Sequence, residues 1–227
     1  CKMLRAGEGI PEGAIAVSTI VSTTMIDAIA KRYGVTIRRT LTGFKYIGNI
    51  ISELVDAGHP ERFLLGFEES YGYLGATHVR DKDAVSASMI ICQMAQHYKL
   101  HGMNLADAMR ALYEEYGYYR NKTVTLSFPG AQGASHMAQI MSNLHNEPMQ
   151  TFAGHTVLDT IDYQEGYNGL PKADVVECRL PNDNKVIFRP SGTEPKIKAY
   201  LFAKGDTADA AEATIETLEE AAREVLA

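Results

Sequence analysis

The chain has 227 residues, enough for one large domain or two ordinary ones, and a formal net charge of −6. This acidic balance argues against a nucleic-acid or anionic-membrane surface, but it is compatible with a local basic pocket for a small anion. The cysteines Cys1, Cys92 and Cys178 are far apart and form no CxxC pair, so we expect neither a disulfide framework nor a zinc site. A reducing, cytoplasmic setting fits best. We expect no signal peptide or membrane span, and the opening Cys-Lys-Met-Leu-Arg suggests a fragment of a longer protein.

The first half of the chain alternates predicted strands with predicted helices. The strands are expected at residues 14–21, 35–41 and 63–67, and the helices between them end at Gly34 and Val55. This order predicts a three-layer α/β domain with a mixed, mostly parallel sheet.

Polar residues follow the second and third predicted strands. Thr42-Gly43-Phe44-Lys45 comes after the second strand, and Glu68-Glu69-Ser70-Tyr71-Gly72 comes after the third. Ligands of open α/β sheets bind at the carboxyl ends of the strands, and carboxylates and hydroxyls there can hydrogen-bond a polyol such as a sugar. The alternative is that the two glutamates are exposed to water and bind no ligand.

A long helix is expected over residues 85–100, with Met89, Ile90 and Met94 facing inward and Asp83 at its N-cap. His97 and His101 are four residues apart on this helix, but no third ligand accompanies them, so we do not expect a metal site. A further helix ends near Gly117. We place the domain boundary there, giving domains at 1–117 and 118–227.

The second half has short strand-like runs and two predicted helices, which indicates an α+β domain with an antiparallel sheet. Ser135 is expected to cap the first helix, and Thr207 is expected to start the last one. Between two strand-like runs lies Arg189-Pro190-Ser191-Gly192-Thr193-Glu194-Pro195. Its guanidinium, hydroxyls and glycine are the chemistry of a phosphate-binding turn, although Pro, Ser and Gly also make ordinary hairpin turns.

Four stretches together resemble the α-D-phosphohexomutases, the family of phosphoglucomutase and phosphomannomutase. These stretches are residues 41–45, 66–72, 80–83 and 189–195, and they follow one another in the family's order over nearly the whole chain. The resemblance implies the third and fourth of four domains, the last with a TATA-binding-protein-like sheet.

The resemblance also implies roles for individual residues. Lys82 falls where the phosphoglucomutase branch has an active-site lysine, a candidate general acid or base. The implied substrate contacts are Thr42, Gly43, Lys45, Glu68, Ser70 and Arg80. The implied phosphate contacts are Arg189, Ser191, Gly192 and Thr193.

Two parts of the family's active site have no match in this chain. The phosphorylated serine loop is absent, because Ala134-Ser135-His136 lacks the Asn-Pro that follows it in the family. The aspartate-rich Mg²⁺ loop is absent too, and Arg80-Asp81-Lys82-Asp83 does not replace it. We therefore expect no metal site in this fragment, Mg²⁺ binding by missing upstream domains of the same protein, and no catalysis by the fragment alone.

The expected activity of the full-length enzyme is the interconversion of hexose 1-phosphate and hexose 6-phosphate through a phosphoserine and a bisphosphate intermediate, with glucose as the first choice of sugar. Phosphomannomutase and phosphopentomutase remain open as alternatives. So do a non-catalytic phosphosugar-binding module and an interaction domain whose turn binds nothing.

Overall fold

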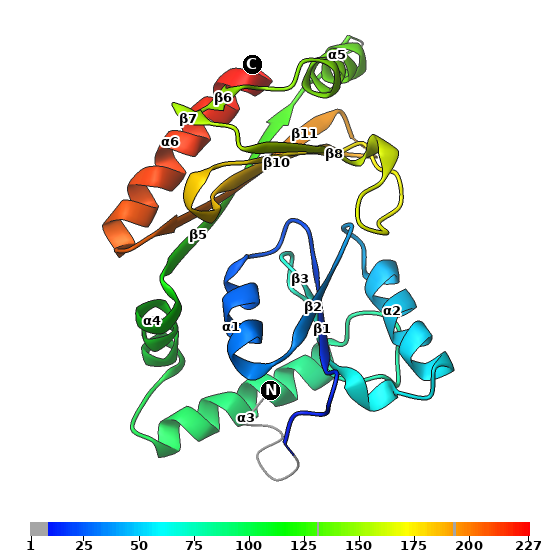
Figure 1. The fold of residues 1–227 in the computed structure, drawn as a ribbon, viewed down its shortest axis with the longest axis vertical. Helices are drawn as coiled ribbons and strands as arrows, with labels where there is room; N and C mark the ends of the chain where they lie inside the picture. Colours follow the sequence, from blue (N-terminus) through cyan, green and yellow to red (C-terminus); the bar gives the residue numbers. More distant parts are fainter. Residues whose placement is uncertain (1–8, 131, 193) are drawn as a thin grey trace. The chain divides into compact units, whose positions relative to one another are not determined.

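The computed structural model describes residues 9–130, 132–192 and 194–227. The chain divides into two compact units, residues 1–116 and 117–227, and each is described by itself. The first unit is α/β and the second is α+β, as the sequence predicts (Figure 1).

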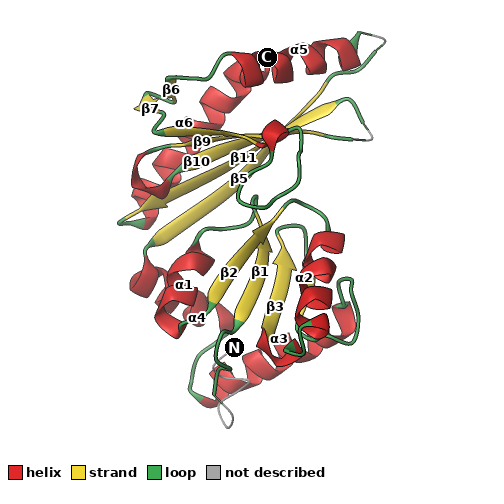
Figure 2. Ribbon diagram, turned by 45° about the vertical axis from the view of Figure 1, so that its right-hand side comes forward, coloured by secondary structure: helices red, strands yellow, loops and turns green. Residues whose placement is uncertain are grey.

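The first unit is built on a four-stranded sheet in the order β2-β1-β3-β4. Its elements are β1 (Ile15–Thr19), α1 (Met25–Tyr33), β2 (Thr36–Thr40), α2 (Phe44–Asp56), a 3₁₀ turn (Pro60–Arg62), β3 (Phe63–Glu68), β4 (Gly72–Leu74), α3 (Ala84–Leu100) and α4 (Leu105–Tyr116). β1 pairs in parallel with β2 and β3, and β4 returns antiparallel to β3. Helices α1 and α2 flank the sheet on opposite sides (Figure 2), the arrangement that right-handed crossovers require.

Close packing of α2 on the sheet forms the core of this unit. The buried residues are Ile15, Val17, Phe44, Ile47, Ile50, Ile51, Leu54, Phe63 and Leu74. A Cβ added at Gly66 of β3 would lie 2.5 Å from Cγ2 of Ile47, so the helix approaches the strand where the strand has no side chain. This packing fixes the start of α2, and with it the loop before the helix.

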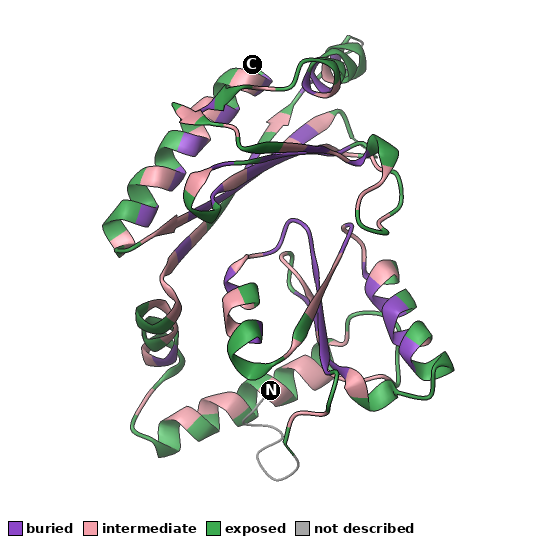
Figure 3. Cartoon of the chain, in the orientation of Figure 1, coloured by how far each residue is buried: buried purple, intermediate pink, exposed green. Residues whose placement is uncertain are grey.

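Helix α3 faces inward only in part, because Ile90 and Met94 are half-buried as expected but Met89 is not. Met89 is 56% exposed, Val85 is 82% exposed, and no residue of α3 is fully buried. Figure 3 shows the contrast with the buried stripe of α2. Apolar residues such as Val85 and Met89 lie on its exposed side among polar ones such as Gln93, so apolar character alone does not show which side is covered. The predicted cap is confirmed, because Asp83 Oδ1 accepts hydrogen bonds from the backbone N–H groups of Val85 and Ser86.

The second unit is built on a five-stranded antiparallel sheet in the order β5-β11-β10-β9-β8. Its elements are β5 (Tyr118–Ser127), α5 (Gly133–Asn146), β6 (Thr151–Phe152), β7 (His155–Thr156), β8 (Asp159–Asp162), a 3₁₀ turn (Tyr163–Glu165), β9 (Val176–Arg179), a 3₁₀ turn (Pro181–Asp183), β10 (Lys185–Pro190), β11 (Lys196–Gly205) and α6 (Ala208–Leu226). Helices α5 and α6 cover the same face of this sheet (Figure 2).

The core of the second unit lies between the sheet and these two helices. Val186, Phe188, Ala199 and Leu201 point into it from β10 and β11, and α6 contributes a buried stripe: Ala211, Ile215, Leu218, Ala222 and Leu226. Because side chains alternate along a strand, Lys185, Ile187 and Arg189 lie on the other face of β10.

Helix α5 begins earlier than predicted. Its first residue is Gly133, so Ser135 lies inside the helix and is not its cap. A Cβ at Gly133 would come within 1.7 Å of the carbonyl oxygen of Phe128, and only glycine fits there. Thr207 caps α6 as predicted, since its Oγ1 accepts from the Ala210 N–H at 3.1 Å. None of the described helices has both the length and the apolar character that crossing a membrane requires.

Candidate functional site

The first candidate element is the carboxyl edge of the parallel strands in the first unit. β1 ends at Thr19, β2 ends two residues before Thr42, and β3 ends at Glu68. Parallel strands end at one edge of the sheet, which therefore carries hydroxyls after two strands and carboxylates after the third.

Glu68 and Gly43 are in direct contact. The backbone N–H of Gly43 donates to Glu68 Oε1 at 2.6 Å, so two of the predicted substrate-binding residues, 25 positions apart, meet. Gly43 precedes the first residue of α2 and has φ of +127°, a conformation that favours glycine. The glycine thus lets the helix N-terminus hold the carboxylate, while the second carboxylate oxygen can accept hydrogen bonds from a ligand.

Glu69, to which the sequence assigned no separate role, connects the same loop to β1. Its Oε2 accepts from Thr19 Oγ1 at 3.1 Å, and its Oε1 accepts from Ser70 Oγ at 3.5 Å. Thr19 is completely buried and lies 2.9 Å from the hydroxyl of Ser22. The run of hydroxyls after β1, Ser22-Thr23-Thr24, was the signal in the sequence that could have indicated this polar edge.

Arg39 of β2 fixes the backbone of the loop after β1. Its guanidinium donates to the carbonyl oxygens of Thr19 at 3.0 Å and Thr23 at 3.3 Å, and pairs with Asp27 at 2.5 Å. This side chain is 22% exposed, and its N–H groups donate to partners within the protein. It therefore supports the edge and does not offer a free cation to a ligand.

Three hydroxyl oxygens in the strands and loops near this edge are buried and have no hydrogen-bond partner: Ser18 Oγ, Thr40 Oγ1 and Thr42 Oγ1. Buried polar groups in folded proteins are nearly always paired, and an orphan group calls for an explanation. Thr42 is one of the predicted substrate-binding residues. A ligand or water at the edge would satisfy its hydroxyl.

Lys82 lies beside this loop system. Its ammonium is 5.8 Å from the ring centroid of Phe44, whose ring also packs against Gly72 at the start of β4. Asp81 Oδ1 accepts from the Lys82 backbone N–H at 2.7 Å and from its Nζ at 3.1 Å. These hydrogen bonds, the backbone one first, lower the pKa of Asp81. The carboxylate thus orients Lys82, which is still 58% exposed.

Arg80 and Lys45 are placed differently from Lys82. The Arg80 guanidinium donates to Ser52 Oγ at 3.1 Å and also to the carbonyl oxygen of Thr77. These bonds attach the loop before α3 to the outer part of α2. Lys45 is exposed in the first turn of α2, with its Nζ 4.9 Å from the Tyr46 ring centroid.

The second candidate element is the turn between β10 and β11. Its backbone is closed by hydrogen bonds from Ser191 N to Lys196 O at 2.8 Å and from Lys196 N to Glu194 O at 2.7 Å. Arg189 lies on the face of the sheet opposite to the helices, and its Nη1 is 3.4 Å from the Tyr200 hydroxyl. No ion pair of Arg189 occurs among the described residues. The predicted contact Thr193 lies outside the described residues.

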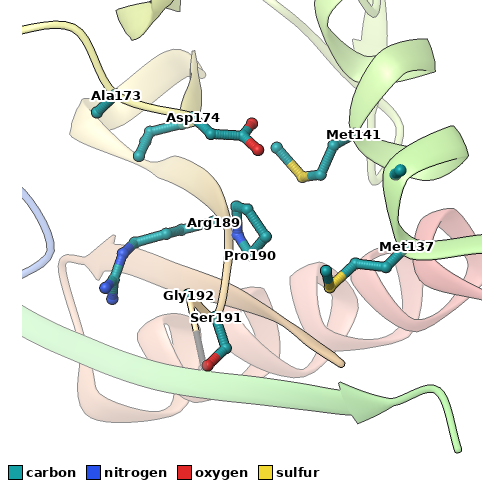
Figure 4. A pocket seen from close by; sticks show the side chains of 10 residues that line it. Met137, Met141, Ala173, Asp174, Arg189, Pro190, Ser191 and Gly192 are labelled. Carbon is teal, nitrogen blue, oxygen red and sulfur yellow. The ribbon is translucent and has the colours of Figure 1, made fainter. Parts of the chain in front are cut away.

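A pocket of about 390 Å³ adjoins this turn. It is lined by Met137, Ala138, Met141, Ala173, Asp174, Val175, Arg189, Pro190, Ser191 and Gly192. Figure 4 shows the carboxylate of Asp174 directed toward Met141, while the guanidinium of Arg189 points away from both methionines. The turn therefore has a side with the half-buried Arg189 cation and, against α5, a mainly apolar side that carries one carboxylate.

Over residues 9–130, 132–192 and 194–227, no group of three or more His, Cys, Asp or Glu side chains is placed to hold a metal ion. His97 and His101 are close, with ring centroids 4.5 Å apart. The resemblance places Mg²⁺ in other domains of the protein, and this stays a prediction.

Sequence comparison gives close relatives. Residues 2–116 match the family model of phosphoglucomutase/phosphomannomutase, alpha/beta/alpha domain III. A phosphoglucomutase of Staphylococcus haemolyticus is 34% identical over 216 residues, covering 90% of this chain and 39% of the relative. A probable phosphomannomutase of Haemophilus influenzae is also 34% identical over 216 residues, covering 95% of this chain and 41% of the relative. The chain thus spans about two fifths of the length of these relatives.

Solved structures show the same fold. The phosphoglucomutase parafusin from Paramecium matches with a TM-score of 0.67 and 22% identity, over 92% of this chain and 37% of its own. A putative phosphomannomutase from Thermus thermophilus matches with a TM-score of 0.61 and 17% identity, over 99% of this chain and 38% of its own. From the match of residues 2–116 and these relatives, we conclude that the chain belongs to the phosphoglucomutase/phosphomannomutase family.

Proposed function

We propose that this chain is the substrate-binding, C-terminal part of a phosphohexomutase that interconverts hexose 1-phosphate and hexose 6-phosphate. Residues 1–117 correspond to the family's third domain and 118–227 to its fourth. The observation that carries the proposal is the contact between Gly43 N and Glu68 Oε1, because it joins two loops that family resemblance assigns to sugar binding. The longer relatives named phosphoglucomutase and phosphomannomutase support it.

Each of the two elements carries chemistry suited to one part of a sugar phosphate. Arg189, Ser191, Gly192 and Thr193 bind the phosphate, because a guanidinium and hydroxyl donors match its oxygens. On the first unit, the second oxygen of Glu68 accepts from a sugar hydroxyl and the exposed Ser70 hydroxyl donates to one.

This chemistry suits a substrate that binds in two orientations. A mutase that works through a bisphosphate intermediate has to hold either phosphate while the other one reacts. A guanidinium turn binds both phosphates equally well, since it contacts only the phosphate oxygens. Neighbouring ring hydroxyls likewise resemble one another as hydrogen-bonding groups, so one carboxylate and one hydroxyl serve both orientations.

Lys82 is the candidate proton donor or acceptor in this chain, since Asp81 holds it beside the sugar-binding loop. The phosphoserine and the Mg²⁺ ligands belong to other domains of the proposed full-length enzyme. Mg²⁺ there would supply charge stabilisation at the transferring phosphoryl group. We therefore propose that this chain alone binds substrate but does not turn it over.

Glucose is the proposed sugar, and mannose is the second candidate because of the Haemophilus influenzae relative. The test is an assay of the full-length protein with the 1-phosphates of glucose, mannose and ribose, in the presence of Mg²⁺ and a hexose bisphosphate. We expect the highest kcat/KM for glucose 1-phosphate. Turnover of ribose phosphate alone would identify the full-length protein as a phosphopentomutase. No turnover of any of the three sugar phosphates would support a non-catalytic binding module instead.

A further inference from the structure

A tyrosine at the tip of the hairpin between β3 and β4 has both an unusual backbone conformation and an exposed ring. Glu68 of β3 pairs with Gly72 of β4, so the hairpin loop consists of the three residues between them. Tyr71 is the last of these, with φ of +62°, and it is 88% exposed. Within the described part of the chain, Tyr71 has no hydrogen bond, ion pair or ring contact. The roles proposed above leave this residue without a function.

The backbone conformation of Tyr71 disfavours a side chain of this size. In the left-handed region the Cβ atom crowds the following carbonyl oxygen, so three-residue hairpin loops normally have glycine at this last position. The other non-glycine residues with positive φ in the described ranges are alanine or the Asn and Asp that tolerate this region: Ala153, Asn168, Asn182 and Asp183. A tyrosine at this position therefore lowers stability relative to glycine.

Packing within the unit does not account for the tyrosine. A single exposed aromatic ring is common on protein surfaces, but the ring of Tyr71 also requires a backbone conformation that no contact of its own stabilises. Gly72, the next residue, shows the contrast, because a Cβ there would lie 3.1 Å from the Phe44 ring. The loop is thus closely packed up to Tyr71, whose ring extends into solvent. Strained residues of this kind are concentrated at ligand-binding sites.

Tyr71 lies between the proposed sugar contacts along the loop. Ser70 immediately precedes it. Oε2 of Glu68, the carboxylate oxygen to which Gly43 does not donate, lies 3.5 Å from the position of a Cβ on Gly72, which immediately follows. The exposed ring of Tyr71 therefore belongs to the same short loop that offers a hydroxyl and a carboxylate oxygen to a sugar.

A sugar ring has two kinds of surface, hydroxyl groups around its rim and C–H groups on its faces. A carboxylate and a hydroxyl, as at Glu68 and Ser70, match the rim, but neither of them matches a C–H face. An aromatic ring matches it, because the ring buries apolar surface and its negative face attracts the C–H hydrogens. Small-molecule sites accordingly combine a few polar groups with aromatic walls.

We propose that Tyr71 is a specificity-determining residue whose ring stacks on a C–H face of the sugar in a bound sugar phosphate. The contact with the sugar offsets the strain that the protein alone does not relieve. A six-membered sugar ring covers more of the tyrosine ring than a five-membered one, so the contact favours hexose phosphates over pentose phosphates. The inference rests on the proposed function, which assigns the sugar to this edge of the first unit.

Calorimetric titration and urea unfolding of the chain test the proposal together. Y71G removes the ring and the strain, so the urea midpoint should rise while affinity for glucose 1-phosphate falls about two- to tenfold. Affinity for ribose 1-phosphate should fall less, and affinity for inorganic phosphate should not change. Y71F keeps the ring and should bind as the wild type does. The control is Y33A, which removes an exposed tyrosine at the end of α1, at the opposite edge of the sheet, and should leave all three affinities unchanged.

Three outcomes would count against the proposal. A lower urea midpoint for Y71G would show that the ring supports the fold, and would overturn the proposed role. An unchanged affinity of Y71G for glucose 1-phosphate, with weaker binding in E68Q, would overturn the role of Tyr71 and leave the sugar-binding edge intact. A wild-type chain that binds neither glucose 1-phosphate nor inorganic phosphate would overturn the proposed function and this inference with it.

Discussion

The carboxyl edge of the first unit and the β10–β11 turn of the second, the proposed sugar and phosphate contacts, are built in opposite ways. At the edge, Glu68 and Glu69 already accept hydrogen bonds from Gly43 and Thr19. At the turn, hydrogen bonds fix the backbone, while the guanidinium of Arg189 has a 3.4 Å contact with Tyr200. The edge therefore already uses its polar groups within the fold, whereas the turn uses its cation little, and under the proposed function the edge serves both folding and binding. Mutations should separate these two designs.

The largest effect on binding is expected for R189A. A hydrogen-bonded pair with a charged group is worth about 1.5–3 kcal/mol, so affinity for both hexose phosphate and inorganic phosphate should fall roughly ten- to a hundredfold. The free energy of unfolding should stay within about 0.5 kcal/mol, since the side chain supports little of the fold.

Calorimetry and urea unfolding measure these two quantities for R189A. The matched control is K172A, which removes an exposed cation of the same unit, 72% exposed. Unchanged phosphate affinity in R189A would refute the phosphate-binding role of the turn.

The sequence predicts the edge and the turn only in part, because some of their contacts join residues that are far apart along the chain. The residue types at Glu68, Ser70 and Arg189 were sufficient to predict polar loops, and their binding role stays a prediction. The contact of Glu69 with Thr19 joins residues 50 positions apart, and no local sequence pattern predicts it. The strand β4 was missed because three residues are too few to show a period.

Helix α3 shows a second limit of prediction from sequence. Its apolar residues point to burial, but periodicity identifies a covered side only when polar residues mark the other side. Helix α2 has such a polar side, and its inward residues are buried. The exposed side of helix α3 mixes polar residues such as Gln93 and Gln96 with apolar ones, and Met89 lies there.

Two glycine substitutions, one at the edge and one at the turn, test the comparison of these elements through the free energy of unfolding. Gly43 has φ of +127°, so G43A should strain the start of α2 and lower the free energy of unfolding by about 1–3 kcal/mol. A Cβ at Gly192 meets nothing within 4 Å, so G192A should cost less than about 0.5 kcal/mol.

The G43A variant should also lose affinity for hexose phosphate, because the Gly43 N–H that holds Glu68 moves. Its affinity for inorganic phosphate should stay the same, since the phosphate turn belongs to the other unit. Urea unfolding and calorimetry on both glycine variants would check this. Equal stabilities of G43A and G192A would contradict the view that the edge is built for folding as well as binding.

A smaller effect is expected for E69Q. The amide keeps the shape of the side chain but loses the charge that strengthens the hydrogen bonds from Thr19 and Ser70, at a cost of about 1 kcal/mol in unfolding. Hexose phosphate affinity should fall severalfold and inorganic phosphate affinity should not. E12Q, at an exposed position of the same unit, is the control. An E69Q variant as stable as E12Q would mean that Glu69 does not hold the loop to β1.

The smallest perturbation is chemical labelling of the cysteines, which needs no change to either element. Cys92 is exposed on α3, whereas burial raises the pKa of the Cys178 thiol in the second core to about 11. The thiolate is the reactive form, so alkylation at about pH 8 should modify Cys92 quickly and Cys178 only when the second unit opens. Peptide mapping by mass spectrometry during urea unfolding follows both sites. If G43A destabilises only the first unit, it should leave the labelling rate of Cys178 unchanged, and a faster rate in that variant would show that the two units unfold together.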